Sequence, residues 1–276
     1  IVAYERRTSP VSYDNIFPFV IMKHGCAVMM GAPATQVAIS EGSFGGESML
    51  LLEHFNFPGV LSLDTVAEET SDGLHYWLRE LRLGSPFFRW REVLLAAKRS
   101  LYVSGDYTSA CILAQTAGEI LLDGVTCLLM WEEKIEPAVA RTIYDQRREI
   151  GPRVMSELAT RLKGVWSSQG DGIFAKWCAE TSLLRHRVVH AGYDPTYYEA
   201  RQSCRATHAL MTYAMDRLAE QSSRYPRTSY MLLAQGGLRA RGRWTKQMKS
   251  FIDNESIREP DWRESFADWR QEFGSA

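Results

Sequence analysis

The chain has 276 residues, of which 45% are hydrophobic and 24% are charged, and its formal net charge is −1. This composition excludes long disorder, a collagen-like repeat and a small disulfide scaffold. No run of about 18 apolar residues occurs, so the sequence predicts no transmembrane helix and no membrane partner. The near-neutral total hides an asymmetry: the net charge is −5 over residues 1–88, +1 over 89–220 and +3 over 221–276.

Residues 1–88 contain short apolar runs separated by Gly- and Pro-rich punctuation, such as 31–33 and 42–46. Short runs bounded by turn residues are typical of strands, whereas 72–83 has helical spacing. We therefore expect a small α+β domain at 1–88, whose role the sequence does not indicate. The predicted fold class of the whole chain is α+β, with this β-containing unit followed by an all-α bundle.

From residue 89 the pattern becomes that of long helices. Gly105–Asp106 predicts a helix stop followed by a new N-cap, and 107–130 then carries apolar residues at three- and four-residue steps. Pro137 predicts the start of the next helix, and Gly151–Pro152 predicts a break. The domain prediction for 89–220 is a bundle of four or five main helices.

Two helices close this bundle. The first is predicted from Ile173 to His190, and its inner-face residues are Ile173, Phe174, Trp177, Thr181, Leu184 and Val188. Asp194–Pro195 then predicts the start of a helix that runs to Glu220. Residues 221–276 form the third predicted domain, a basic and amphipathic helical extension. Basic residues surround Trp244 there, and a solvated face is the favoured interpretation over an RNA contact.

Cysteine usage indicates the compartment. The five cysteines are odd in number and form no CxxC or zinc-finger spacing. Four of them fall in predicted helices, where a free cysteine behaves as a small buried hydrophobe. We therefore expect a reducing, cytoplasmic setting.

One segment combines residue types that suit chemistry: Leu183 to Gly192, LLRHRVVHAG. Arg185 and His190 are separated by four residues at the end of a helix. Five residues at about 100° each place them about 140° apart on an ideal helix. They can act on one ligand only if the last turn loosens or a second chain completes the site.

This segment resembles the HEPN superfamily, the higher eukaryote and prokaryote nucleotide-binding domains, whose signature is Arg, four to six residues, then His. The polar His186 after the Arg, the Val189–His190 ending and the preceding Ala-rich helix with Glu119 are similar to the family. The resemblance covers roughly residues 90–220. In one toxin subgroup a Tyr follows the His by two residues, whereas Tyr193 follows here by three.

The resemblance implies a metal-independent endoribonuclease that acts on RNA as a homodimer in a defence, toxin or stress pathway and needs no cofactor. His190 would move a proton and Arg185 would stabilise phosphate charge, because imidazole titrates near neutrality and guanidinium matches phosphate geometry. His186 is the third expected catalytic residue. The residues expected to bind substrate are Arg187, Tyr193 and Glu119. Residues 1–88 would then serve as a sensor or as the docking unit for a regulatory partner.

Two alternatives remain open. Many HEPN members are non-catalytic modules, and the first alternative is a catalytically silent dimer that binds RNA, a nucleotide or a protein partner. His186 and His190 also have the i, i+4 spacing that can chelate a transition metal, with His208 as a conceivable third ligand. No phosphate-binding GxxxxGK[ST] loop and no GxSxG elbow occurs in the sequence.

Overall fold

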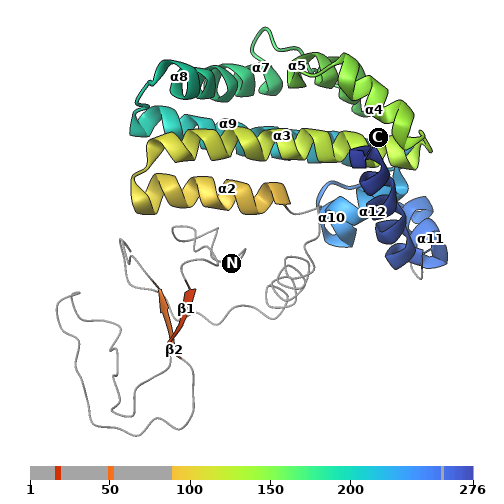
Figure 1. Ribbon diagram of the computed structural model, residues 1–276. Helices are drawn as coiled ribbons and strands as arrows, with labels where there is room; N and C mark the ends of the chain where they lie inside the picture. Colours follow the sequence, from red (N-terminus) through yellow and green to blue (C-terminus); the bar gives the residue numbers. More distant parts are fainter. Residues whose placement is uncertain (1–15, 20–48, 53–88, 256–257, 276) are drawn as a thin grey trace, which may run out of the picture.

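The computed structural model describes residues 16–19, 49–52, 89–255 and 258–275 (Figure 1). The first two ranges are the strands β1 (Ile16–Phe19) and β2 (Met49–Leu52), which pair antiparallel. The remainder is helical. The α-helices are α2 (Arg89–Arg99), α3 (Tyr107–Glu132), α4 (Pro137–Gln146), α5 (Ile150–Arg153), α6 (Ala159–Leu162), α7 (Ile173–Trp177), α8 (Leu183–Ala191), α9 (Tyr197–Glu220), α10 (Pro226–Ala240), α11 (Lys246–Glu255) and α12 (Glu259–Ser275). Three π-helical turns extend them: η3 (Ser100–Ser104), η4 (Val154–Leu158) and η5 (Cys178–Ser182).

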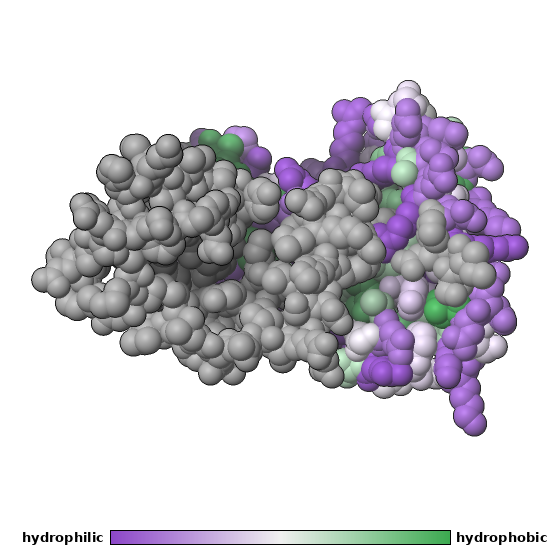
Figure 2. All heavy atoms as spheres, turned by 90° about the horizontal axis from the view of Figure 1, so that it is seen from below, coloured by the Kyte–Doolittle hydropathy of each residue, from purple (hydrophilic) through white to green (hydrophobic). Residues whose placement is uncertain are grey.

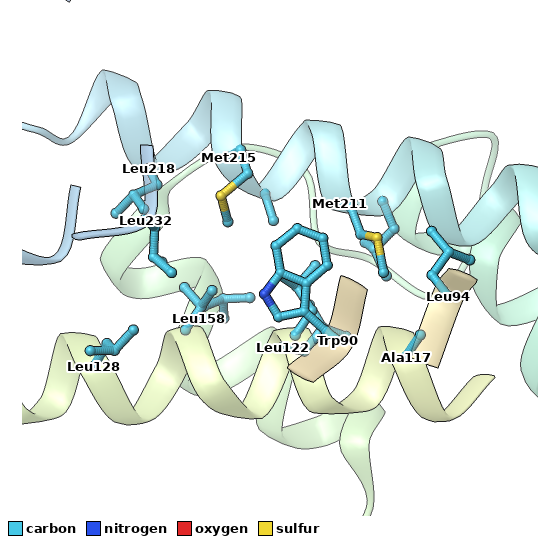
Figure 3. Close-up of a cluster of buried hydrophobic side chains, with 14 of the residues drawn as sticks. Trp90, Leu94, Ala117, Leu122, Leu128, Leu158, Met211, Met215, Leu218 and Leu232 are labelled. Atoms are coloured by element: carbon cyan, nitrogen blue, oxygen red, sulfur yellow. The ribbon is translucent and has the colours of Figure 1, made fainter. Parts of the chain in front are cut away.

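The two longest helices, α3 and α9, form the centre of the bundle. Helix α2 lies along one side of this pair, and α7 and α8 lie along the other (Figure 1). Their apolar faces meet in one continuous core, in which ten labelled residues come from α2, α3, η4, α9 and α10 (Figure 3). Burial of this apolar surface is the main force that holds the helices together.

Helix α3 begins where its sequence predicts and ends two residues after the predicted residue 130. Gly105 adopts a left-handed conformation with φ of 65°, and the Asp106 side chain accepts a hydrogen bond from the Ser109 N–H at 2.9 Å. The predicted stop and N-cap are therefore confirmed. By length and composition α3 could cross a membrane, but 61% of its most apolar window is buried inside the protein. Its apolar character is thus explained by its place in the core.

The predicted α+β fold class is wrong. The two long described ranges, 89–255 and 258–275, contain helices and no strand, so this part of the chain is all-helical. The β1–β2 pair has four residues in each strand, which is too little to form a domain with a core of its own. The rest of the predicted 1–88 unit lies outside the described residues, as does the helix predicted at 72–83.

Two helix boundaries also differ from prediction. Gly151–Pro152 does not break a helix but lies in the first turn of α5, where the missing proline N–H needs no partner. Helix α9 begins two residues after Pro195, because Thr196 and not Asp194 is its N-cap. Thr196 and Glu199 form a capping box in which each side chain bonds to the backbone N–H of the other.

The C-terminal helices α10 to α12 pack onto the bundle at one end (Figure 1). The Glu132 carboxylate accepts hydrogen bonds of 2.9 Å from the backbone N–H groups of Arg227 and Thr228, in the first turn of α10. A row of buried aromatic side chains faces α3 and α4 from α12, as its amphipathic sequence predicts: Trp262, Phe266, Trp269 and Phe273.

Burial controls the reactivity of the cysteines. It is the main cause that raises the pKa of Cys111 to about 12 and those of Cys178 and Cys204 to about 11. Because only the thiolate is a good nucleophile, we expect these three thiols to resist iodoacetamide at pH 8 in the folded protein and to react promptly in urea. Peptide mass spectrometry after timed labelling measures this. Rapid native labelling of Cys111 or Cys204 would contradict the packing.

Candidate functional site at the junction of α8 and α9

The Arg–His segment occupies α8, the last part of one continuous helical rod. This rod runs from Ile173 through α7 and η5 to Ala191. Five of the six predicted inner-face residues are buried, and Ile173 is partly buried. The π-helical turn η5 ends directly before Leu183, and such turns often adjoin functional sites. The hydrophobic pattern therefore predicted which side of α8 faces the core.

The end of α8 is fixed by Gly192, which adopts φ of 62° and ψ of 31°. The N–H groups of Gly192 and Tyr193 both donate to the Arg187 carbonyl oxygen. A side chain at Gly192 would be strained by this backbone conformation. The glycine thus sets where the rod stops, and His190 lies in its last turn.

Arg187 and Tyr193 form a small network with Glu199. The Arg187 guanidinium lies 3.7 Å from the centroid of the Tyr193 ring, and its Nη1 is 3.6 Å from Glu199 Oε1. The Tyr193 hydroxyl donates to the same carboxylate at 3.0 Å. These contacts hold the α8–α9 turn together. Two predicted substrate-binding residues, Arg187 and Tyr193, are therefore engaged with the protein itself.

His186 and His190 lie together on the exposed side of α8. Their ring centroids are 4.8 Å apart with an interplanar angle of 49°, and both side chains are exposed. The i, i+4 spacing places them on the same side of the helix. Two imidazoles are thus presented to solvent side by side, where they can reach a ligand without any rearrangement of the core.

Arg185 is separate from this pair. It is partly buried, and its guanidinium has no hydrogen-bond or ion-pair partner among the residues that the structure describes. Because the last turns of α8 remain helical up to Ala191, the chain does not loosen to bring Arg185 next to His190. A single copy of the described chain therefore presents the guanidinium and the imidazole on different sides of the helix.

Glu119 belongs to a polar contact between α3 and the rod. Gln115 Nε2 donates to Glu119 Oε1 at 2.8 Å, and the Ser182 hydroxyl donates to Gln115 Oε1 at 3.0 Å. Ser182 lies three residues before Arg185. The contact fixes the rod against α3 one turn before the Arg–His segment, so the structure places Glu119 beside the helix that carries the site and shows no contact between it and the histidines.

Sequence reasoning missed two features of this junction. Glu199 was not predicted, although the spacing Thr196–x–x–Glu199 is the signature of a capping box. The exposed apolar side chains of Leu183 and Val189, which are 63% and 43% accessible, were also missed. Leu183 and Val189 thus place large apolar side chains at the surface of the same helix as the two histidines.

The charge of Glu199 stabilises the junction. The backbone N–H of Thr196 is the main cause that lowers the pKa of Glu199, with smaller contributions from Thr196 and Tyr193 hydroxyls and Arg187. A carboxylate with a lowered folded-state pKa adds stability that is present above the unfolded value near 4.3 and is lost as pH falls through the folded value.

We therefore expect Glu199→Gln, which keeps a capping-box side chain, to lower the free energy of unfolding by about 0.5–1 kcal/mol at pH 7. Urea denaturation at pH 7 and pH 3 measures the difference, which should be smaller at pH 3, because the charge-dependent stabilisation is lost as the pH falls toward and through the lowered folded-state pKa of the carboxyl. A gap that stays constant between the two pH values would show that the charge is not responsible.

Among the residues that the structure describes, this site brings together only two potential metal ligands, His186 and His190. Among residues 89–255 and 258–275 no group of three or more His, Cys, Asp or Glu side chains surrounds a common point. His208, the third ligand considered from the sequence, does not join His186 and His190 in such a group.

Comparisons of the chain with protein-family models, with curated proteins and with solved structures find no match.

Proposed function

We propose that the protein is a metal-independent endoribonuclease of HEPN type that works as a pair of copies in the cytoplasm, within a defence, toxin or stress pathway. The observation that carries the proposal is the exposed His186–His190 pair in the same two turns of α8 as an Arg185 guanidinium without a partner among the described residues. Phosphodiester cleavage without a metal requires proton transfer and stabilisation of the phosphoryl charge, and histidine and arginine can supply these two functions.

The reaction balances with these side chains alone. His190 takes the proton of a ribose 2′-hydroxyl as its oxygen attacks the adjacent phosphorus. The bond from phosphorus to the 5′-oxygen breaks, and a protonated imidazole, His186 or a second His190, gives a proton to that oxygen. Arg185 stabilises the charge that grows on the phosphoryl oxygens. The products are a 2′,3′-cyclic phosphate and a free 5′-hydroxyl.

The proposal includes a second copy of the chain, because Arg185 and His190 of one copy are too far apart around α8 to act on the same phosphate. Helix geometry places Arg185 and His190 about 140° apart around α8, and Leu183 and Val189 on the same helix are exposed. If two α8 helices pack through these apolar side chains, the Arg185 of one copy can approach the His190 of the other. A symmetric pair is also the commonest form of oligomer.

An RNA that lacks the 2′-hydroxyl at the cut position tests the proposed cleavage mechanism. A 20-nucleotide RNA is incubated with the protein in EDTA, in parallel with the same strand that carries a single 2′-deoxy nucleotide at the mapped cut. We expect cleavage of the first strand with a cyclic phosphate end and no cut at the deoxy position. Cleavage that requires added metal, or that proceeds at the deoxy position, would rule out the mechanism.

The alternative is a non-catalytic module that binds RNA, a nucleotide or a protein partner through the same face. It is favoured by the involvement of Arg187 and Tyr193 in the Glu199 network, which leaves fewer groups for substrate. Retention of the labelled RNA without any cleavage in the same experiment would identify this function.

A further inference from the structure

A basic surface lies at the end of the bundle away from the α8 site, where α10 is followed by α11 (Figure 1). Residues 221–252 include seven basic residues and no acidic one. Three of the seven have acidic partners: Arg224 pairs with Glu133 and Arg241 with Asp216 on the bundle, and Arg227 pairs with Glu255 at the end of α11. These ion pairs hold the segment in place, and the three arginine charges are balanced by the carboxylates.

Four cations remain, and all of them are exposed: Arg239 near the end of α10, and Arg243, Lys246 and Lys249 beyond it. Arg243, Lys246 and Lys249 are exposed, and their side chains have no hydrogen-bond or ion-pair partner among the residues that the structure describes. We call these three residues the α11 basic surface. Met248 and Ile252 are the buried residues of α11 and define the side that faces the core. Lys246 and Lys249 lie outside this side and are exposed to solvent.

The turn that presents this surface is well fixed. Arg241 Nε donates to Asp216 Oδ1 at 2.7 Å, and the Arg243 N–H donates to the Leu238 carbonyl oxygen at 2.8 Å. Trp244 is partly buried and packs against Tyr230 with ring centroids 6.4 Å apart. The exposed cations therefore lie on an ordered turn between α10 and α11, next to the partly accessible indole of Trp244. The described surface at this end is largely hydrophilic when seen from below (Figure 2).

The chemistry of the surface favours a nucleic acid over a membrane. A helix that binds a membrane inserts exposed apolar side chains, and none of the large exposed hydrophobic residues of the described chain lies in α10 or α11. Unpaired Arg and Lys with a nearby indole instead match a sugar–phosphate strand, which offers regular negative charge and stacking bases.

We propose that the α11 basic surface is a non-catalytic binding site for the phosphate backbone of RNA. The inference rests on the proposed function for its choice of RNA. Helix α3 separates this surface from α8 along the bundle (Figure 1), and its 26 residues span about 40 Å. At about 3.4 Å per nucleotide, a strand that contacts both ends needs about 12 nucleotides. The surface therefore serves long RNA and not short fragments.

Salt-dependent binding tests the site. Fluorescence anisotropy measures the affinity of a labelled 20-nucleotide uridine RNA between 50 and 300 mM KCl, with His190→Ala as the parent protein to prevent cleavage. Replacing Lys246 and Lys249 by glutamine removes two phosphate contacts. We expect affinity at 100 mM salt to fall about 10-fold and the slope of log affinity against log salt to decrease by about 1.4.

The matched control is Arg148→Gln with Lys176→Gln, two exposed cations of α4–α5 and α7 that change the net charge equally. An equal loss in both double variants would show that net charge and not this surface binds RNA, and an unchanged slope would also overturn the proposal. So would binding of phosphatidylserine vesicles by a protein that does not bind the RNA.

The cleavage and binding measurements distinguish RNA binding by the α11 basic surface from RNA cleavage at α8. Loss of binding in the α11 variant with no cleavage by the native protein supports the site and rejects the enzyme. Cleavage by the native protein with normal binding in the α11 variant supports the enzyme and rejects the site.

Discussion

His190→Ala is expected to reduce RNA cleavage by about 10²- to 10⁴-fold, the usual contribution of a positioned acid–base group. The change should leave the fold intact, because the imidazole is exposed and its only described contact is with His186. Cleavage of the 20-nucleotide RNA in EDTA and a thermal unfolding curve measure the two quantities on the same preparation.

The matched control is His208→Ala, an exposed histidine on the neighbouring helix α9. It should retain most of the native activity. Retained cleavage in His190→Ala, or an equal loss in His208→Ala, would remove His190 from the proposed mechanism.

Gly118→Ala is expected to destabilise the protein by about 1–3 kcal/mol, although alanine is the better helix former. A Cβ atom at Gly118 would lie 2.7 Å from Cζ2 of the fully buried Trp177. The indole has no room to retreat, because its Nε1 donates to Thr207, whose hydroxyl donates to the Ala114 carbonyl oxygen. Urea denaturation measures the change in the free energy of unfolding.

Gly124→Ala provides the control on the same helix, because nothing lies within 4 Å of a Cβ atom built there. It should be neutral or stabilise the protein by up to about 1 kcal/mol. If Gly118→Ala behaves like Gly124→Ala, the close approach of α7 to α3 is not as the structure describes. The rod that carries α8 would then be placed differently on the bundle.

The helical bundle was predictable where local signals act alone. Gly105–Asp106 marks the start of α3 because a left-handed residue and a side-chain cap are both local requirements. The buried positions Trp177 and Val188 follow from helical periodicity. The start of α9 was predicted two residues too early. Asp194–Pro195 has the residue types of a helix start, but the reciprocal hydrogen bonds of Thr196 and Glu199 make Thr196 the N-cap.

The candidate site was predictable only in part. The motif located Arg185, His186 and His190 on a helix end, and spacing alone indicated that Arg185 and His190 diverge. The contact between Gln115 and Ser182 joins residues 67 positions apart, and no local pattern encodes it. The strands predicted over 1–88 rested on turn residues and short apolar runs, which do not specify how such runs pair in space.

The central claim is that an imidazole and a guanidinium from two copies of α8 act on one phosphate. Arg185→Ala and His190→Ala proteins, each inactive alone, are mixed, and cleavage of the RNA in EDTA is measured once native mass spectrometry shows mixed pairs. Activity is expected to return, because a mixed pair retains one Arg185 and one His190 on different chains. Mixed pairs that remain inactive, while native protein mixed with the Arg185→Ala/His190→Ala double variant stays active, would contradict it.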